Sequence, residues 1–366
     1  MSAGVAVEAL TLTLGAFRLG KIDLAVAPGE ILVILGPNGA GKSVTLETIA
    51  GFHRPEGGSV LIGGRDATAL PPERRHVGFV VQNFGLFPHL SVARNVAIAR
   101  RRGRAKAALS VAMPQLDDTA ALLRYFGIAH LAARTPADLS PGEKQRVALA
   151  RALAGAPDLF LFDEPFSALD AQTRGELRDE LQTFLRALPI PAIFVTHDRS
   201  DATTLADRVV LLRDGAVVQS GTAAQVFRRP VNSFVARFVG VENVLSGRVV
   251  GTVGDIASVE IGRHILHAAE PAEPFPPGTS VVLGIRAEDA KVSALPAKAV
   301  PSLIVNEFNG RISALRHEGA LAVVTVDCGF PLHAYLLAPQ AREMGLAPER
   351  QVTVEIAPGA IHLMRE

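Results

Sequence analysis

A glycine-rich loop near the start of the chain has the residue types and spacing of a phosphate-binding site. Glycines let the backbone wrap closely around a phosphate, a lysine supplies a cation to the outer phosphates, and a serine hydroxyl is a ligand for Mg2+. The strand-like run 30–35 precedes the loop and a helical stretch at 44–50 follows it, as this chemistry requires. We therefore predict that ATP or GTP is bound by Gly36, Pro37, Asn38, Gly39, Ala40, Gly41, Lys42 and Ser43.

Two adjacent carboxylates follow a second apolar run. Leu159 to Phe162 has the pattern of a strand buried on both faces, and Asp163 and Glu164 come directly after it. Ligands of open parallel sheets bind at the carboxyl ends of the strands. This placement predicts that Asp163 holds Mg2+ through water and that Glu164 polarises the water that attacks the terminal phosphate. A solvated strand end is the alternative when the pair is taken alone.

A histidine follows a third apolar run. Residues 193–195 are Ile-Phe-Val and lead into Thr196, His197 and Asp198. A lone histidine is more often structural than catalytic, but the position of His197 after a buried strand favours contact with the terminal phosphate.

The segment 139–153 contains a clear helix start. Ser140 and Glu143 have the spacing of a capping box, and Pro141 occupies the first helical position. A helix beginning here has amides free to face an anion. The alternative is simply a well-capped helix.

These side chains need a parallel sheet to bring them together. The three short apolar runs predict its buried strands, and apolar residues at helical spacing predict a helix that covers one face. Asp214 and Gly215 between two apolar runs predict a hairpin that closes the nucleotide domain. The expected fold is α/β, and the residues that define the cover helix are Leu177, Leu181, Phe184, Leu185 and Leu188.

Composition limits what this domain is attached to. The chain has 366 residues, 48% of them hydrophobic, and 37 Lys and Arg against 36 Asp and Glu, so its net charge of +1 gives no field that would recruit nucleic acid. No apolar stretch approaches the roughly 20 residues needed to span a bilayer. The N-terminus lacks the pattern of a secretory signal, so we expect a cytoplasmic protein. Cys328 is the only cysteine, which excludes an internal disulfide.

The last third of the chain contains an internal repeat. Three residues recur 63 positions later and a tripeptide recurs 66 positions later, in strand-rich surroundings. The pattern predicts two small five-stranded barrels of the OB type. The matched residues are Asn243, Gly247 and Arg248 with Asn306, Gly310 and Arg311, and Leu266 to Ala268 with Leu332 to Ala334.

The ordered motifs resemble those of the ATP-binding subunits of ABC transporters. The loop 36–43 is similar to Walker A, residues 163–164 to Walker B, and 139–143 to the signature. The resemblance implies a P-loop NTPase fold of the ABC ATPase type. It also implies that Gln82 senses Mg2+ and the membrane partner, and that His197 is the switch histidine.

Phe17 is similar to the aromatic residue that stacks on adenine in this family. An equal alternative is that Phe17 is simply part of the hydrophobic core. The resemblance also implies a helical subdomain at about 84–150, which receives a short helix of a permease. Phe84, Leu86 and Phe87 suit such a groove, with buried packing inside the subdomain as the alternative.

In the same family, each nucleotide lies between Walker A of one subunit and the signature of another. The resemblance therefore implies a head-to-tail homodimer, with Ser140, Gly142 and Glu143 acting on the nucleotide of the second subunit. The family usually has glycine and glutamine at the positions of Pro141 and Glu143. Proline removes one amide donor and glutamate adds charge near phosphate.

The tail is similar to the tandem TOBE domain of importer ATPases. The chain is thus expected to divide into an ABC domain at 1–239 and a regulatory, OB-like tandem TOBE domain at 240–366. The segments 14–19, 41–51 and 334–348 are similar to molybdate and tungstate importers, which favours an oxyanion as cargo. Sulfate, ferric ion, polyamine or sugar importers are the alternatives, and a soluble ABC ATPase of DNA repair or translation is a further one.

The resemblance implies an ATPase with ATP and Mg2+ as cofactors, in which Ser43, Gln82 and Asp163 act on the metal. It would bind peripherally to the cytoplasmic face of the inner membrane. Its partners would be permease subunits and, indirectly, a substrate-binding protein, and nucleic acid is not expected among them.

Overall fold

The computed structural model describes residues 4–100, 118–269, 274–294 and 306–366. Contacts divide the chain into two compact units, 1–226 and 227–366. The segment 227–239, which contains helix α9 (Ser233–Phe238), groups with the C-terminal unit.

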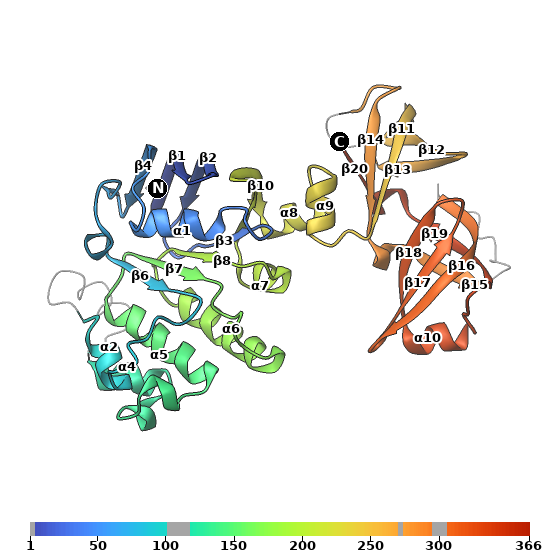
Figure 1. The fold of residues 1–366 in the computed structure, drawn as a ribbon. Helices are drawn as coiled ribbons and strands as arrows, with labels where there is room; N and C mark the ends of the chain where they lie inside the picture. Colours follow the sequence, from blue (N-terminus) through green and yellow to red (C-terminus); the bar gives the residue numbers. More distant parts are fainter. Residues whose placement is uncertain (1–3, 101–117, 270–273, 295–305) are drawn as a thin grey trace. The chain divides into compact units, whose positions relative to one another are not determined.

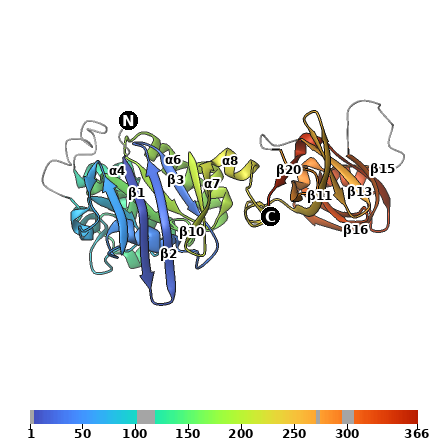
Figure 2. The same ribbon diagram turned by 90° about the horizontal axis from the view of Figure 1, so that it is seen from above.

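The N-terminal unit contains two sheets (Figure 1). The first is antiparallel, and its long strands β1 and β2 run side by side (Figure 2). In the second, β9, β3, β8, β7 and β6 are parallel and β10 is antiparallel to β9. In spatial order, the strands of the first sheet are β2 (Phe17–Val26), β1 (Val5–Leu14), β4 (Gly57–Ile62) and β5 (Arg65–Asp66). Those of the second sheet are β10 (Ala216–Thr222), β9 (Arg208–Arg213), β3 (Ile31–Leu35), β8 (Ala192–Val195), β7 (Leu159–Asp163) and β6 (Val77–Val80).

The parallel strands are buried on both faces, as the apolar runs predict. Leu32 and Ile34 pack into a core shared with the first sheet and with α1 (Lys42–Ala50). On β7, Phe160 contacts Phe184 of α6 (Ala171–Arg186) at a ring-centroid distance of 6.2 Å, and Phe162 stacks on Phe194 of β8 at 4.2 Å. Alternate side chains therefore support α1 on one face and the predicted cover helix on the other (Figure 1).

A buried arginine binds the C-terminal end of α1. Arg75 is 1% exposed and donates hydrogen bonds to the carbonyls of Thr48 and Ile49 in the last turn of that helix, and to those of Thr68 and Leu70. In the last turn of α1, the guanidinium binds the Ile49 carbonyl and adds a donor to the Thr48 carbonyl, which also accepts from the N–H of Gly51. The guanidinium thereby fixes the helix that carries the phosphate loop.

The remaining elements of this unit surround the sheets. The helical part carries α2 and α4 before α5, and the described helices include none long and apolar enough to cross a bilayer. The predicted hairpin at Asp214 and Gly215 is confirmed, with φ of 48° and 76° at these residues. The elements are η1 (Pro72–Arg74), α2 (Val92–Ala97), α4 (Thr119–Tyr125), η3 (Ala129–Leu131), η4 (Pro136–Asp138), α5 (Pro141–Ala154), α7 (Arg199–Leu205) and α8 (Ala223–Arg228).

The C-terminal unit consists of two five-stranded antiparallel sheets, so the predicted OB-like architecture with five strands in each half is confirmed. Its helical elements are α9, η5 (Ala287–Asp289), α10 (Ala338–Glu343) and η6 (Pro358–Ala360). In spatial order, the sheets are β13 (His264–Ala269), β12 (Ile256–Ile261), β11 (Asn243–Val253), β14 (Ser280–Ile285) and β20 (Ile361–Met364), and then β15 (Lys291–Ala294), β19 (Gln351–Ile356), β16 (Asn306–Glu318), β17 (Leu321–Asp327) and β18 (Pro331–Leu337).

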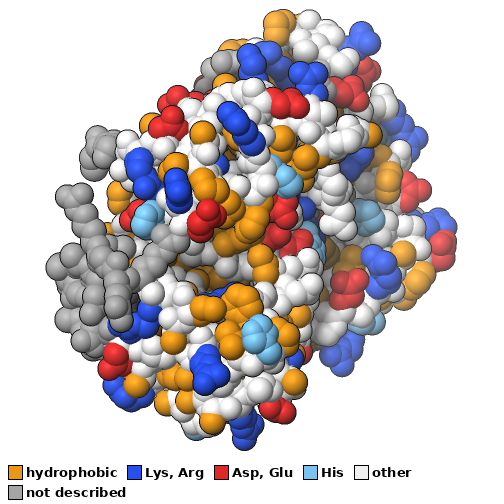
Figure 3. Space-filling model, turned by 60° about the vertical axis from the view of Figure 1, so that its left-hand side comes forward, with side chains coloured by type: hydrophobic (Ala, Val, Ile, Leu, Met, Phe, Trp, Pro, Cys, Tyr) orange, Lys and Arg blue, Asp and Glu red, His pale blue; other side chains and the backbone are white. Residues whose placement is uncertain are grey.

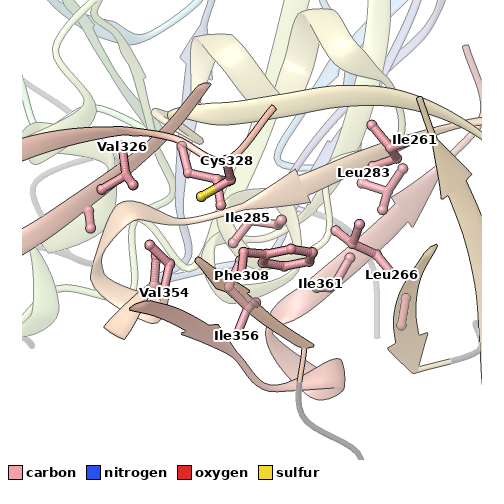
Figure 4. Packing of buried hydrophobic residues seen from close by; sticks show 14 of the residues in the cluster. Ile261, Leu266, Leu283, Ile285, Phe308, Val326, Cys328, Val354, Ile356 and Ile361 are labelled. Atoms are coloured by element: carbon pink, nitrogen blue, oxygen red, sulfur yellow. The ribbon is translucent and has the colours of Figure 1, made fainter. Parts of the chain in front are cut away.

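The two copies exchange their last strands, which the repeat spacing does not predict. β15 follows the first copy but pairs with β19 of the second, and β20 follows the second copy but pairs with β14 of the first. One hydrophobic cluster contains residues of both sheets, among them Leu283, Ile285, Phe308, Val354 and Ile361 (Figure 4). The copies therefore share one core.

The repeated asparagines join the copies reciprocally. Asn243 accepts a hydrogen bond from the backbone N–H of His333 and donates to its carbonyl, at 2.6 and 2.9 Å. Asn306 makes the same pair with His267, at 2.6 and 2.8 Å. Both asparagines are almost fully buried, so the repeat seen in the sequence marks the contact between its two copies.

Candidate nucleotide site

The phosphate loop connects β3 to α1 through backbone conformations that favour glycine. Gly36 has a φ of 155°, and a Cβ placed on it would lie 2.3 Å from the carbonyl oxygen of Leu212. Gly41, with a φ of 98°, is the N-cap of α1 and provides no side-chain cap. The first amides of this nine-residue helix are thus left for an anion, at the positive end of the helix dipole.

The lysine of the loop is buried and folded back onto it. The ammonium of Lys42 donates to the carbonyls of Gly36 and Pro37, at 2.8 and 3.0 Å, and the residue is 6% exposed. Burial lowers the pKa of Lys42, while the nearby carboxylates of Glu164 and Asp163 act in the opposite direction. A phosphate entering the loop would meet a cation that is already held in place.

Two oxygen ligands suited to Mg2+ lie together beside the loop. The hydroxyl of Ser43 donates to Oδ1 of Asp163 at 3.0 Å. Burial raises the pKa of Asp163, and its hydrogen bond from Ser43 partly opposes that shift. A hydroxyl and a partly buried carboxylate fit a small divalent cation, which prefers oxygen ligands and would compensate the partly buried charge.

The second carboxylate is held between two polar side chains. Oε1 of Glu164 lies 2.9 Å from Nδ1 of His197, and Oε2 accepts a weaker hydrogen bond from Nε2 of Gln82 at 3.4 Å. Glu164 has a φ of 45°, an uncommon conformation for a residue other than glycine. The structure thus brings together Gln82, Glu164 and His197, which are far apart in the sequence.

Four residues that the sequence reading did not select hold the loop that carries His197. Thr196 donates from its hydroxyl to the buried Asp201 at 3.0 Å. Asp198 caps α7 and forms an ion pair with Arg174 of α6 at 2.9 Å. The capping position of Asp198, directly after a strand, is the one signal in the sequence that could have identified this support.

Phe17 lies against the phosphate loop. A Cβ placed on Gly41 would be 2.6 Å from Cζ of Phe17, so the ring packs directly on the backbone that starts α1. Phe17 is partly buried and also packs against the hydrophobic core. The ring therefore lies beside the predicted nucleotide loop and also contacts the core.

The signature residues form the predicted helix start. Ser140 accepts from the backbone N–H of Glu143 at 3.3 Å, and the Glu143 carboxylate accepts from the N–H of Ser140 at 2.7 Å. The second contact is the main reason why the pKa of Glu143 is lowered. Helix α5 lies on the face of the sheet opposite to α1 (Figure 1), so the fold places the signature and the phosphate loop on different sides of the sheet.

A groove of about 620 Å3 opens beside the segment that follows Gln82. Three of its lining side chains are large, apolar and exposed, namely Phe52, Phe87 and Ile98, at 59%, 40% and 57%. Figure 3 shows hydrophobic side chains on either side of a hollow on one face of the N-terminal unit. Of the side chains predicted for a permease groove, Phe87 is among the lining residues and Phe84 and Leu86 are not.

Comparison with known proteins identifies the family. The model of the ABC transporter family matches residues 19–167. The molybdate/tungstate import ATP-binding protein WtpC of Pyrococcus abyssi is 35% identical, over 97% of this chain and 98% of its own length. The chain belongs to the ATP-binding subunits of ABC transporters. Accordingly, it is an ATPase that energises import.

Other relatives import different solutes. The putative 2-aminoethylphosphonate import ATP-binding protein PhnT of Salmonella typhimurium is 36% identical and covers 89% of this chain and 86% of its own length. The spermidine/putrescine import ATP-binding protein PotA of Lawsonia intracellularis is 38% identical, at 85% and 83% coverage. A solved structure of the ATP-binding cassette MJ0796, dimeric and bound to ADP and Pi, is 28% identical with a TM-score of 0.50 and covers 60% of this chain and 98% of that one. The ABC ATPase fold that the sequence predicts is thereby confirmed.

Proposed function

We propose that the chain powers the import of an oxyanion of the molybdate and tungstate type. The observation that carries this proposal is the similarity to WtpC over nearly the whole of both chains, including the C-terminal unit. ATP-driven uptake into vesicles that contain the reconstituted transporter would test it. Molybdate and tungstate should be accumulated, whereas accumulation of only 2-aminoethylphosphonate or a polyamine would assign the chain to the alternatives that PhnT and PotA represent.

We propose that the site works as a phosphate cradle beside a water-activating carboxylate. The loop amides and Lys42 would hold the phosphates, and Ser43 and Asp163 would hold Mg2+, which neutralises phosphate charge when bound. Gln82, which lies beside Glu164, would also contact this metal. Glu164 would orient and polarise the attacking water, with His197 fixing that carboxylate and contacting the terminal phosphate.

Two substitutions separate binding from turnover. Lys42→Ala should abolish nucleotide binding, because it removes the buried cation of the cradle. Glu164→Gln should retain binding and lose turnover, because the amide cannot accept a proton. Equilibrium binding of a fluorescent ATP analogue and steady-state phosphate release measure the two effects, and robust turnover by the glutamine variant would remove Glu164 from this role.

We propose further that two copies close head to tail around two nucleotides. The placement of α1 and α5 on opposite faces of the sheet supports this arrangement, because Ser140, Gly142 and Glu143 would then complete the site of a second copy. ATP should convert the Glu164→Gln protein from monomer to dimer in light scattering. A protein that stays monomeric with saturating ATP, alone and with its permease, would refute this proposal.

We also propose that the groove beside Phe87 receives a short apolar helix of the permease. Its exposed apolar side chains support this partner, since such a cluster on a monomer marks an interaction surface. The subunit would then lie on the cytoplasmic face of the inner membrane, and a substrate-binding protein would deliver the cargo to the permease from the other face. Ile98→Asp should weaken copurification of the permease and leave ATP binding unchanged.

The C-terminal residues 240–366 are proposed to form a regulatory tandem TOBE domain, joined to an ABC domain at 1–239. The shared core of its two OB-like sheets supports a single module. Equilibrium dialysis of the full chain with molybdate, tungstate, sulfate and ferric ion tests whether this module binds cargo. Absence of binding to all four would leave it a structural role.

A further inference from the structure

The segment that follows Gln82 is held in an unusual backbone conformation. Phe84 and Gly85 both have left-handed φ, at 60° and 56°, and the N–H of Phe84 donates to the carbonyl of Val81 at 2.8 Å. Two consecutive residues in this region form a tight turn that is costly for phenylalanine. Such a turn persists where its surroundings impose it.

An arginine of the signature helix imposes this turn. Arg151 lies in α5, and its two terminal nitrogens donate to the carbonyls of Gly85 and Phe84, at 2.5 and 3.0 Å. The same guanidinium stands over the ring of Phe87, 5.7 Å from its centroid. One rigid, forked cation therefore contacts three of the four residues 84–87.

A second anchor fixes the other end of the segment to the helical part. Asn95 of α2 is fully buried and accepts from the N–H of Phe87 at 2.8 Å, while its amide group donates to the carbonyl of Phe87 at 3.1 Å. Thus α2 and α5 both hold the segment. Gln82, only two residues before Phe84, instead reaches Glu164 at the end of β7.

We infer that Arg151 is a positioning residue that makes Gln82 follow the movement of the signature helix. Helix α5 is capped by Ser140 and carries Arg151 about three turns after this cap. A shift of the signature is therefore passed along one helix to the carbonyls of Phe84 and Gly85. The contact of Gln82 with Glu164 then depends on where the second subunit's nucleotide places the signature. The inference rests on the roles proposed above for Gln82 and for the signature.

The guanidinium is suited to this task for two reasons. Its planar fork reaches two carbonyls at once, whereas an ammonium is a point charge that fixes neither direction. Burial lowers the pKa of Arg151, but a guanidinium remains charged throughout the physiological range. Its charge is therefore constant, and what would change during the cycle is the position of the helix.

Three variants of the full chain test the inference, namely Arg151→Met, Arg151→Lys and, as matched control, Arg146→Met. Arg146 lies on the same helix but bonds to Glu180 and to the carbonyl of Phe126, away from the turn. Amide hydrogen exchange of residues 83–87 is the direct readout. We expect it to accelerate at least tenfold in Arg151→Met and by a smaller factor in Arg151→Lys, with no change in the control.

Steady-state ATP hydrolysis by the full chain without the permease gives the second readout, because Arg151 also lines the groove proposed for the permease helix. Because the turn does not touch the phosphate loop, the KM for ATP should stay within about twofold while kcat falls roughly tenfold or more in Arg151→Met, since small misplacements of site residues have effects of this size. Arg151→Lys should be intermediate, and Arg146→Met should resemble the unmodified protein.

Two results would overturn the inference. One is unchanged exchange of residues 83–87 in both Arg151 variants, and the other is a rise in KM with normal kcat. If Arg151→Met fails to fold, Arg151→Lys alone decides between these outcomes. Failure of the proposed function would look different, because the unmodified protein would then hydrolyse no ATP or Glu164→Gln would retain turnover.

Discussion

The buried asparagine at the junction of the two C-terminal copies offers a quantitative test of the shared core. Asn243→Ala removes three hydrogen bonds, one accepted from His333 and two donated to the carbonyls of His333 and Ile285. At about 1 kcal/mol net for each bond, the variant should lower the free energy of unfolding of this unit by about 3 kcal/mol. Asn306→Ala should have a similar effect, because it removes the equivalent three bonds.

The single cysteine can be used to measure unfolding of this unit. Cys328 is 3% exposed in the shared core, and burial raises its pKa to about 11, so it should react slowly with thiol reagents in the folded protein at pH 8. When closing is faster than modification, the rate follows the population of the open form. A loss of about 3 kcal/mol then corresponds to modification roughly a hundredfold faster.

A matched control lies on the same strand as Asn306. Asn309 is exposed and accepts one side-chain hydrogen bond, from Thr353 at 2.9 Å, so Asn309→Ala should accelerate modification by no more than about tenfold. The reasoning would be refuted if Asn243→Ala folded and its modification rate stayed within about threefold of the unmodified protein. It would also be refuted if only one of the two buried asparagines affected Cys328, because a shared core opens as a whole.

Three further predictions concern the N-terminal unit. Arg75→Met should destabilise it by about 3 to 5 kcal/mol in chemical denaturation, because four hydrogen bonds to backbone carbonyls are lost, two of them buried and two partly buried, and a smaller loss than about 1 kcal/mol would contradict that role. Gly36→Ala should abolish ATP binding in calorimetry, because its Cβ would clash with Leu212, and normal affinity would show that the loop adapts. Asp163→Asn should raise the Tm without nucleotide at pH 7, since a raised pKa means that ionisation opposes folding. The gain should disappear as the pH falls and the native carboxyl becomes protonated, and a gain that persists in acid would argue against burial as its cause.

The sequence predicts those features that depend on local pattern. Apolar runs locate β3, β7 and β8, and the spacing of Ser140 and Glu143 gives the start of α5, because burial on both faces and helix capping each leave a mark within a few residues. The repeat locates Asn243 and Asn306, because each copy has an asparagine at the same position. Gln82 is different, since only the family resemblance selects it and its contact with Glu164 joins residues that follow two neighbouring strands, β6 and β7.

Contacts to backbone carbonyls escape such reasoning. Arg75 and Arg151 are ordinary arginines in the sequence, and every residue has a carbonyl, so nothing local indicates which ones they bind. The left-handed φ of Phe84 and Glu164 cannot be predicted from the sequence either, because neither residue is a glycine. The exchange of β15 and β20 cannot be predicted from the repeat either, since each strand has the same pattern in its own sheet or in the other.

The exchanged strands also set an order for folding during synthesis. The first sheet of the C-terminal unit is completed by β20, at residues 361–364, although its other four strands end at residue 285. The ribosome makes the chain from its N-terminus, so this edge of β14 has no partner until nearly the whole chain has emerged. The nucleotide-binding unit can fold earlier, while the tail must wait, and a chain that stops before β20 would carry an exposed strand edge of the kind that aggregates.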